Sequence, residues 1–259
     1  MAPEALLAHF SEQTVAAFFL VLARISPLFL LAPLFSSKMI NSRVKGIVAV
    51  ALAVGLMPVV KHGEIDLDVL NYAGLLVKEL IVGLAFAYAL HAMFAALQAA
   101  GTLLDTLIGF SFGAIVDPVT GTQSAVIQQM YSLFGVAIFV AIGGDTWVIK
   151  GMAKTYDAVP LLGAPPINSM VEGAQIAFSS IFTSAFMICA PVLIAIVIVD
   201  AAFGVVSKVV PQMNIFAVGF PAKMIVGLTL IGASLPFVSG FIADQLQLSV
   251  AQALSALGG

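Results

Sequence analysis

Residues 211–221 read PQMNIFAVGFP. Two prolines, an asparagine and a glycine in this stretch predict a chain reversal rather than a helix interior, because proline removes a backbone donor and the other two favour turns. The stretch separates an apolar run that ends near the charged Lys208 from the last apolar run of the chain. We therefore expect two helices that turn back on each other here.

The composition is that of a membrane protein. Charged residues make up only 9% of the chain and hydrophobic residues 61%, whereas soluble domains carry roughly 25% charged residues. A soluble domain of 259 residues could not cover that much apolar surface, so the helices must face lipid, partner proteins or both. The net charge of −3 gives no electrostatic footprint for nucleic acid. The single cysteine, Cys189, excludes an internal disulfide.

Apolar runs near the length of a membrane-spanning helix predict the fold class. We expect an all-α polytopic integral membrane protein, with residues 1–259 forming a single helical membrane domain. Two of its runs are longer than a straight span of about 30 Å requires, so their helices should tilt, kink or extend beyond the bilayer. The six predicted segments cover about residues 14–35, 44–60, 69–100, 126–149, 174–206 and 213–243.

The topology and the proline kinks each leave alternatives open. The loop at 36–45 carries three basic residues and the loop at 150–173 carries two, which favours the cytoplasmic side for both. Six simple spans would put these loops on opposite sides. Prolines in the apolar runs predict either ordinary kinks or curved hairpins packed in an assembly. They are Pro27, Pro33, Pro58, Pro191, Pro221 and Pro236.

One face of the third segment carries small residues. Alanines recur at spacings of three and four, which places them on a face about 80° wide, and Gly74 and Lys78 project onto the same face. Small residues let helices approach closely in membranes, so the stripe predicts a helix–helix contact. Its alanines are Ala85, Ala89, Ala92, Ala96 and Ala100.

Charged residues inside the apolar runs need partners. Each would cost about 2.5–3.5 kcal/mol at the middle of a bilayer. They could form a proton relay, form buried structural pairs, or lie outside the lipid. Lys78 and Glu79 project about 100° apart on a helix, so we expect a separate partner for each. The charged residues are Arg24, Lys78, Glu79, Asp105, Asp200, Lys208 and Lys223.

A connection over about 101–125 interrupts the apolar runs. It holds a Gly-Phe-Ser-Phe-Gly sequence at 109–113 and an Asp-Pro pair at 117–118. Long connections of this kind are usually functional or disordered, and the low charge argues against disorder. It could be a hairpin tucked against its own helices or a movable plug.

Enzyme motifs are missing from the sequence. There is no phosphate-binding loop, dinucleotide-binding fingerprint, metal-spaced Cys/His cluster or hydrolase motif. We therefore expect neither catalysis nor a cofactor.

Several motifs resemble, in their order along the chain, the FliR family of the flagellar type III export gate, shared with the T component of injectisome gates. The resemblance extends over about 200 residues. The matching residues are Arg24-Ile-Ser-Pro27-Leu-Phe29, Ala32-Pro33-Leu34-Phe35, Arg43-Val44-Lys45, Glu79 with Gly83, Gly109-Phe110 through Ala114, Asp117-Pro118, Asp200 with Gly204, and 211–221.

This resemblance implies a non-enzymatic subunit of a protein export channel. One copy would assemble with FliP-like and FliQ-like subunits in the bacterial inner membrane, at the flagellar basal body, with FlhB and FlhA nearby. The helical hairpins would form the channel, unfolded flagellar proteins would pass through it, and lipid would contact its outer surface. A small secondary transporter and an injectisome export-gate subunit remain the alternatives.

Three groups of candidate site residues accompany this assignment. The channel plug or gate would comprise Gly109, Phe110, Phe112, Gly113, Asp117 and Pro118. The buried charges and packing positions would be Arg24, Lys78, Glu79, Asp200, Gly204 and Lys208, the last three of which share a helix face. The turn motif would comprise Pro211, Gln212, Asn214, Phe216, Gly219 and Pro221.

Overall fold

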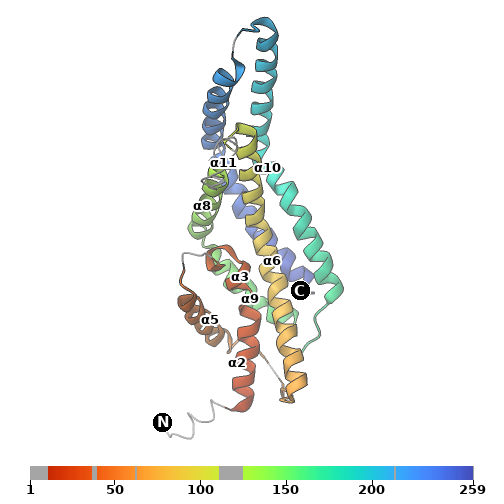
Figure 1. Cartoon of the computed structure of the whole chain (residues 1–259). Helices are drawn as coiled ribbons and strands as arrows, with labels where there is room; N and C mark the ends of the chain where they lie inside the picture. Colours follow the sequence, from red (N-terminus) through yellow and green to blue (C-terminus); the bar gives the residue numbers. More distant parts are fainter. Residues whose placement is uncertain (1–10, 37–39, 62, 111–124, 213, 259) are drawn as a thin grey trace. The chain divides into compact units, whose positions relative to one another are not determined.

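The computed structural model describes residues 11–36, 40–61, 63–110, 125–212 and 214–258 (Figure 1). These residues form helices and short connections with no strand among them, which confirms the all-α prediction. The helices are α2 (Glu12–Ile25), α3 (Leu28–Leu31), α4 (Pro33–Ser36), α5 (Ser42–Leu56), α6 (Val69–Ile108), α8 (Val126–Ala141), α9 (Gly144–Ala158), α10 (Ile167–Val209) and α11 (Ile215–Ala256).

The polytopic prediction is also confirmed. Within the described ranges, four stretches are long and apolar enough to cross a membrane, and α8 with α9 would supply a fifth if the pair is one broken span. The predicted segment at 44–60 is α5, a helix of 15 residues. Its length of about 22 Å is shorter than the hydrocarbon core of a bilayer. The four stretches are Glu12–Leu31, Val69–Ile108, Ile167–Val209 and Ala217–Ala256.

Helix α6 is longer than the sequence pattern predicted. It has 40 residues and continues through 101–108, which we had assigned to the following connection. Polar residues and Gly101 interrupt the apolar run there, but none of them breaks a helix. The helix ends at Gly109, whose φ of 101° is easily adopted by glycine and whose N–H bonds to the carbonyl of Asp105 at 3.2 Å.

The predicted chain reversal at 211–221 is wrong beyond Asn214. The turn itself is short, and α11 begins at Ile215 and contains Gly219 and Pro221. The side-chain oxygen of Asn214 accepts a hydrogen bond from the backbone N–H of Ala217 at 3.2 Å. Asparagine is a strong N-cap residue, and one proline inside a helix removes a single backbone bond. The capped helix therefore begins six residues before Pro221, inside the apolar segment predicted at about 213–243.

Packing divides the described chain into two compact units. The first takes its residues from Met1–Ala92, Gly143–Phe178 and Leu246–Gly259, and the second from Met93–Ile142 and Ser179–Gln245. Helices α6, α10 and α11 each contribute residues to both units.

The core of the first unit joins α2, α6, α9 and the end of α11. Leu20, Phe86 and Met152 are almost fully buried. Gly151 of α9 lies so close to α6 and α11 that an added Cβ would come within 2.8 Å of the Phe86 ring and 3.0 Å of Val250. These contacts fix α9 as a buried neighbour of α6.

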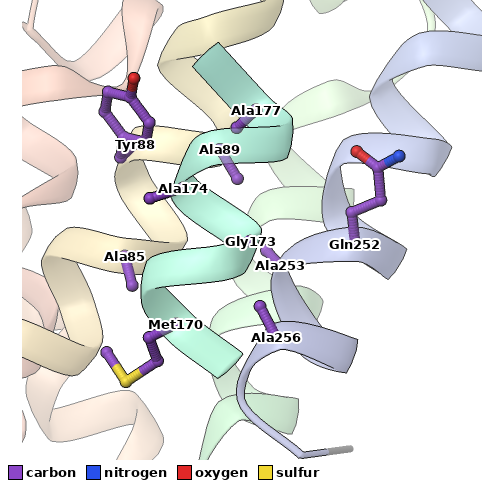
Figure 2. A pocket seen from close by; sticks show the side chains of 10 residues that line it. All are labelled: Ala85, Tyr88, Ala89, Met170, Gly173, Ala174, Ala177, Gln252, Ala253 and Ala256. Atoms are coloured by element: carbon purple, nitrogen blue, oxygen red, sulfur yellow. The ribbon is translucent and has the colours of Figure 1, made fainter. Parts of the chain in front are cut away.

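The alanine stripe makes the predicted helix–helix contact in the first unit. Ala85 and Ala89 of α6 face Ala174 on α10 and Ala253 on α11, and the lining leaves a cavity of only about 20 Å³ (Figure 2). An added Cβ at Gly173 would come within 2.5 Å of the Cβ of Ala256. Small side chains on all three helices permit this close approach.

The second unit packs the end of α6 against α8. The rings of Phe94 and Phe139 make an edge-to-face contact with 5.7 Å between centroids. A Cβ at Gly135 of α8 would come within 2.7 Å of Leu97. The stripe continues here as the buried residues Ala96 and Ala100.

Candidate functional site

Arg24 and Glu79 form a fully buried ion pair in the first unit. Arg24 lies in the last turn of α2 and Glu79 lies in α6, and both side chains are 0% exposed. The guanidinium Nε donates to Oε2 of Glu79 at 2.5 Å. Buried charges are tolerated when paired and hydrogen-bonded, but removal of one partner leaves the other uncompensated. The pair therefore links α2 to α6.

The same guanidinium also binds the end of α9. Its Nη1 donates to the backbone carbonyls of Thr155 at 3.1 Å and Val159 at 2.8 Å. Carbonyls at the end of a helix carry the negative end of its dipole. The Thr155 carbonyl already accepts from the Val159 N–H at 2.9 Å and takes the guanidinium as a second donor. The Tyr156 ring lies beneath the guanidinium, with 4.2 Å between Cζ and the ring centroid. One side chain thus joins α2, α6 and α9.

Lys78 completes this ion cluster, defined here as Arg24, Lys78 and Glu79. Its Nζ donates to the backbone carbonyl of Leu161 at 2.7 Å and lies 3.7 Å from Oε1 of Glu79. Lys78 has the separate partner we expected and also lies within ion-pair distance of Glu79. The long lysine side chain bends across the 100° between the two positions.

Gly83 explains the spacing of the Glu-x-x-x-Gly motif. It lies one turn beyond Glu79, where α2 crosses α6. An added Cβ would overlap the carbonyl oxygen of Arg24 and come within 2.8 Å of its carbonyl carbon. The missing side chain lets the α2 backbone rest on α6, and this brings the Arg24 side chain within reach of Glu79.

Sequence reasoning missed the α9 side of this cluster. Thr155 and Tyr156 belong to no motif that we recognised, and Arg24 bonds mainly to backbone carbonyls on α9. The buried Thr155 hydroxyl donates to the carbonyl of Met152 at 2.7 Å, so it is already satisfied. The amphipathic pattern of α9 could have indicated a helix packed on one face, but not its partner.

The geometry favours structural pairing over a proton relay. The ion cluster contains one carboxylate, and His91 bonds instead to the carbonyl of Leu31 at 3.0 Å. In the part of the chain that the structure describes, no three His, Cys, Asp or Glu residues gather in a group that could hold a metal ion.

The second unit contains a different ion pair. Lys223 of α11 pairs with Asp200 of α10, and their side chains are 25% and 49% exposed. Gly204 and Lys208 follow on the same α10 face and are exposed, and a Cβ at Gly204 would meet nothing within 4 Å. In this chain, Asp200, Gly204 and Lys208 thus form an open face rather than a buried one.

We expect substitution of Asp200 to have a small effect on the stability of the isolated chain. Asp200→Asn should change the free energy of unfolding by no more than about 1 kcal/mol, because exposed ion pairs contribute little. Thermal unfolding in detergent, with Glu79→Gln as the buried comparison, measures this. A loss for Asp200→Asn as large as that for Glu79→Gln would contradict it.

The plug candidates are only partly described. Gly109 ends α6, and an added Cβ would lie 2.8 Å from the Phe220 ring of α11; Phe110 follows and is half-buried. Phe112, Gly113, Asp117 and Pro118 lie outside the described residues.

The turn-motif residues occupy two kinds of position. Pro211 and Gln212 form the turn after α10, and Asn214 caps α11. Phe216, Gly219 and Pro221 belong to the first turns of α11, where Gly219 is buried and Pro221 is exposed.

Comparison with known proteins gives consistent matches along most of the chain. The profile of the family described as bacterial export proteins, family 1, matches residues 15–249. The flagellar biosynthetic protein FliR of Escherichia coli (strain K12) is 25% identical over 224 residues, which cover 86% of each chain. FliR of Bacillus subtilis (strain 168) is 32% identical over 214 residues, or 81% of this chain and 82% of that one.

A relative with a different name matches as well. The surface presentation of antigens protein SpaR of Shigella sonnei is 25% identical over 214 residues, which cover 82% of each chain.

Proposed function

Since this chain belongs to the bacterial export proteins, family 1, and to the FliR family, we propose that it is a non-enzymatic structural subunit of a type III protein export gate. It would build the channel together with FliP-like and FliQ-like subunits, as one copy in the assembly. FlhB and FlhA would lie nearby, in the bacterial inner membrane at the flagellar basal body. Unfolded flagellar proteins would pass through the channel.

The apolar surface of α10 is the observation that carries this proposal. The helix has 43 residues, or about 65 Å at 1.5 Å per residue, which is twice the hydrocarbon thickness of a bilayer. Large apolar side chains are exposed along its whole length, so lipid alone could not cover them. They include Ile167, Ile176, Phe186, Ile194, Val205 and Val209, which are 49% to 73% exposed. Neighbouring protein subunits would cover the remainder.

The ion cluster supports a structural role rather than a transport role. Its charges make helix–helix contacts within the first unit, as the bonds of Arg24 and Lys78 show. A secondary transporter places charged residues around a binding site or an ion path, whereas these charges hold helices together.

Purification from a cell that makes the whole apparatus tests the proposal. In mild detergent, the tagged chain should co-purify with FliP-like and FliQ-like proteins in a defined complex. A transporter would instead be active when reconstituted alone in liposomes. An injectisome export gate is the alternative assembly, and the identity of the co-purified chains distinguishes the two systems.

For the resting channel, we propose a plug contributed by the segment predicted at about 106–122, chiefly by Phe110 and Phe112. Residues 106–108 of this segment belong to α6. Apolar constrictions exclude water and ions. Beyond the end of α6, Gly109 and the half-buried Phe110 are its described part.

Deletion of residues 109–113 should raise ion leakage through the assembled gate. Removing both phenylalanines would leave an aqueous path where the apolar constriction had excluded ions. The measurement is single-channel conductance of the purified complex in planar bilayers. Thr102→Ala is a suitable control, because the Thr102 hydroxyl is exposed and bonds to Gln98 in its own helix. Unchanged conductance in a fully assembled deletion variant would refute the plug.

A further inference from the structure

A buried carboxylate lies in the last turns of α6. Asp105 is 1% exposed, and the backbone N–H groups of Ile127 and Gln128 donate to its two oxygens at 3.0 Å and 2.9 Å. Both donors belong to the first turn of α8. Asp105 therefore bridges the end of one helix and the start of the next.

The sequence at the start of α8 explains why this helix needs Asp105. Its N-cap position is Ala125, which makes no side-chain capping bond. The first N–H groups of a helix lack partners within the helix and are usually satisfied by a Ser, Thr, Asp or Asn at the N-cap. Asp105 supplies that cap from 22 positions away from Ile127, and its negative charge also suits the positive end of the helix dipole.

Close backbone contacts reinforce the same junction. A Cβ at Gly101 would come within 2.9 Å of the backbone nitrogen of Gln128, so α6 and α8 touch through their backbones one turn before Asp105. A longer or differently shaped side chain at position 105 would therefore have little room to adjust.

The end of α6 is also held against α11. Ile108 is fully buried, and a Cβ at Gly227 would come within 2.5 Å of its Cδ1. Gly109 lies against the Phe220 ring, two turns earlier on the same face of α11. The direction in which the chain leaves α6 is therefore set by packing on two helices.

We infer that Asp105 is a positioning residue, which fixes the spacing between the end of α6 at Gly109 and the start of α8 at Ala125. The positioning role of Asp105 is inferred from the described contacts alone. Any effect of Asp105 on the resting channel rests on the proposed function, because the proposed plug segment lies between Gly109 and Ala125.

The spacing is measured by electron–electron dipolar spectroscopy in the assembled complex. Spin labels attach to cysteines introduced at the exposed positions Thr106 and Gln129, in a Cys189→Ala background. With Asp105 present, the distance distribution should be narrow. Asp105→Asn keeps the side-chain volume but turns an amide N–H toward one of the two backbone N–H donors of α8. The distribution of the 106–129 distance should therefore broaden and shift. The same narrow distribution in Asp105→Asn would overturn the inference.

A second variant separates positioning from simple helix capping. Asp105→Ala combined with Ala125→Asp gives α8 a local cap but removes the bond to α6. We expect this double variant to recover the thermal stability lost in Asp105→Ala, while its 106–129 distance distribution stays broad. Recovery of the narrow distribution would show that Asp105 acts only as a cap and would refute the positioning role.

Conductance distinguishes this inference from the proposed plug. A broadened distance with increased leakage supports both. A broadened distance with unchanged leakage leaves the positioning role intact and refutes the plug.

Discussion

Arg24→Ala should prevent the chain from accumulating as a folded subunit. The substitution leaves the Glu79 carboxylate buried without its main partner. It also removes the side-chain donor to the carbonyls of Thr155 and Val159, of which Thr155 keeps its bond from the Val159 N–H. Removing one member of a buried ion pair costs about 3–5 kcal/mol, which is a large share of the 5–15 kcal/mol that stabilises a typical protein. Yield and thermal unfolding of the detergent-purified complex measure the effect.

Arg24→Lys distinguishes charge from geometry. Lysine keeps the positive charge but lacks the planar fork that reaches the Glu79 carboxylate and the α9 carbonyls together. Its stability should fall between those of the wild type and Arg24→Ala. Lys150→Ala, at an exposed position of α9, is the matched control and should unfold like the wild type. Wild-type stability of Arg24→Ala would refute the structural role of the ion cluster.

Gly83→Ala should be nearly as damaging, although it adds a single methyl group. The added carbon would overlap the backbone of Arg24, which cannot rotate away as a side chain could. Helix α2 would have to move, and overpacking of this kind typically costs 1–3 kcal/mol. The displacement would also weaken the Arg24–Glu79 bond, so the full loss should exceed that range.

Gly74→Ala is the control on the same helix. An added Cβ there meets nothing within 4 Å, and alanine is favoured over glycine in helices by about 1 kcal/mol. Gly74→Ala should therefore be neutral or slightly stabilising in the same unfolding measurement. Equal effects at the two glycines would show that the α2–α6 approach is not as close as described.

The sequence predicted the ion cluster in part. Apolar runs indicated membrane helices, and the cost of charges in those runs correctly required partners for Lys78 and Glu79. The bonds of Arg24 to α9 could not be predicted, because a backbone carbonyl at position 159 carries no sequence signal. The role of Gly83 required the crossing of α2 over α6.

The helix ends were predicted less well, for a related reason. Asp105 and its polar neighbours indicated a loop, although Asp105 is satisfied by the α8 backbone and the helix continues. At 211–221 the prolines outweighed the capping signal of Asn214. At Asp105 the stabilising contact comes from another helix, and at 211–221 a local capping bond permits the helix to begin before Pro221.

Photo-crosslinking from position 110 tests the central claim most directly, namely that this chain lines a path for exported proteins. A photoreactive amino acid replaces Phe110 in cells that carry a stalled export substrate, with Leu70, which is 80% exposed on α6, as the control position. The account predicts a covalent adduct between this chain and the substrate from position 110 and none from position 70. Export-competent complexes that give no substrate adduct from position 110, while a FliP-like subunit captures the same substrate, would contradict it.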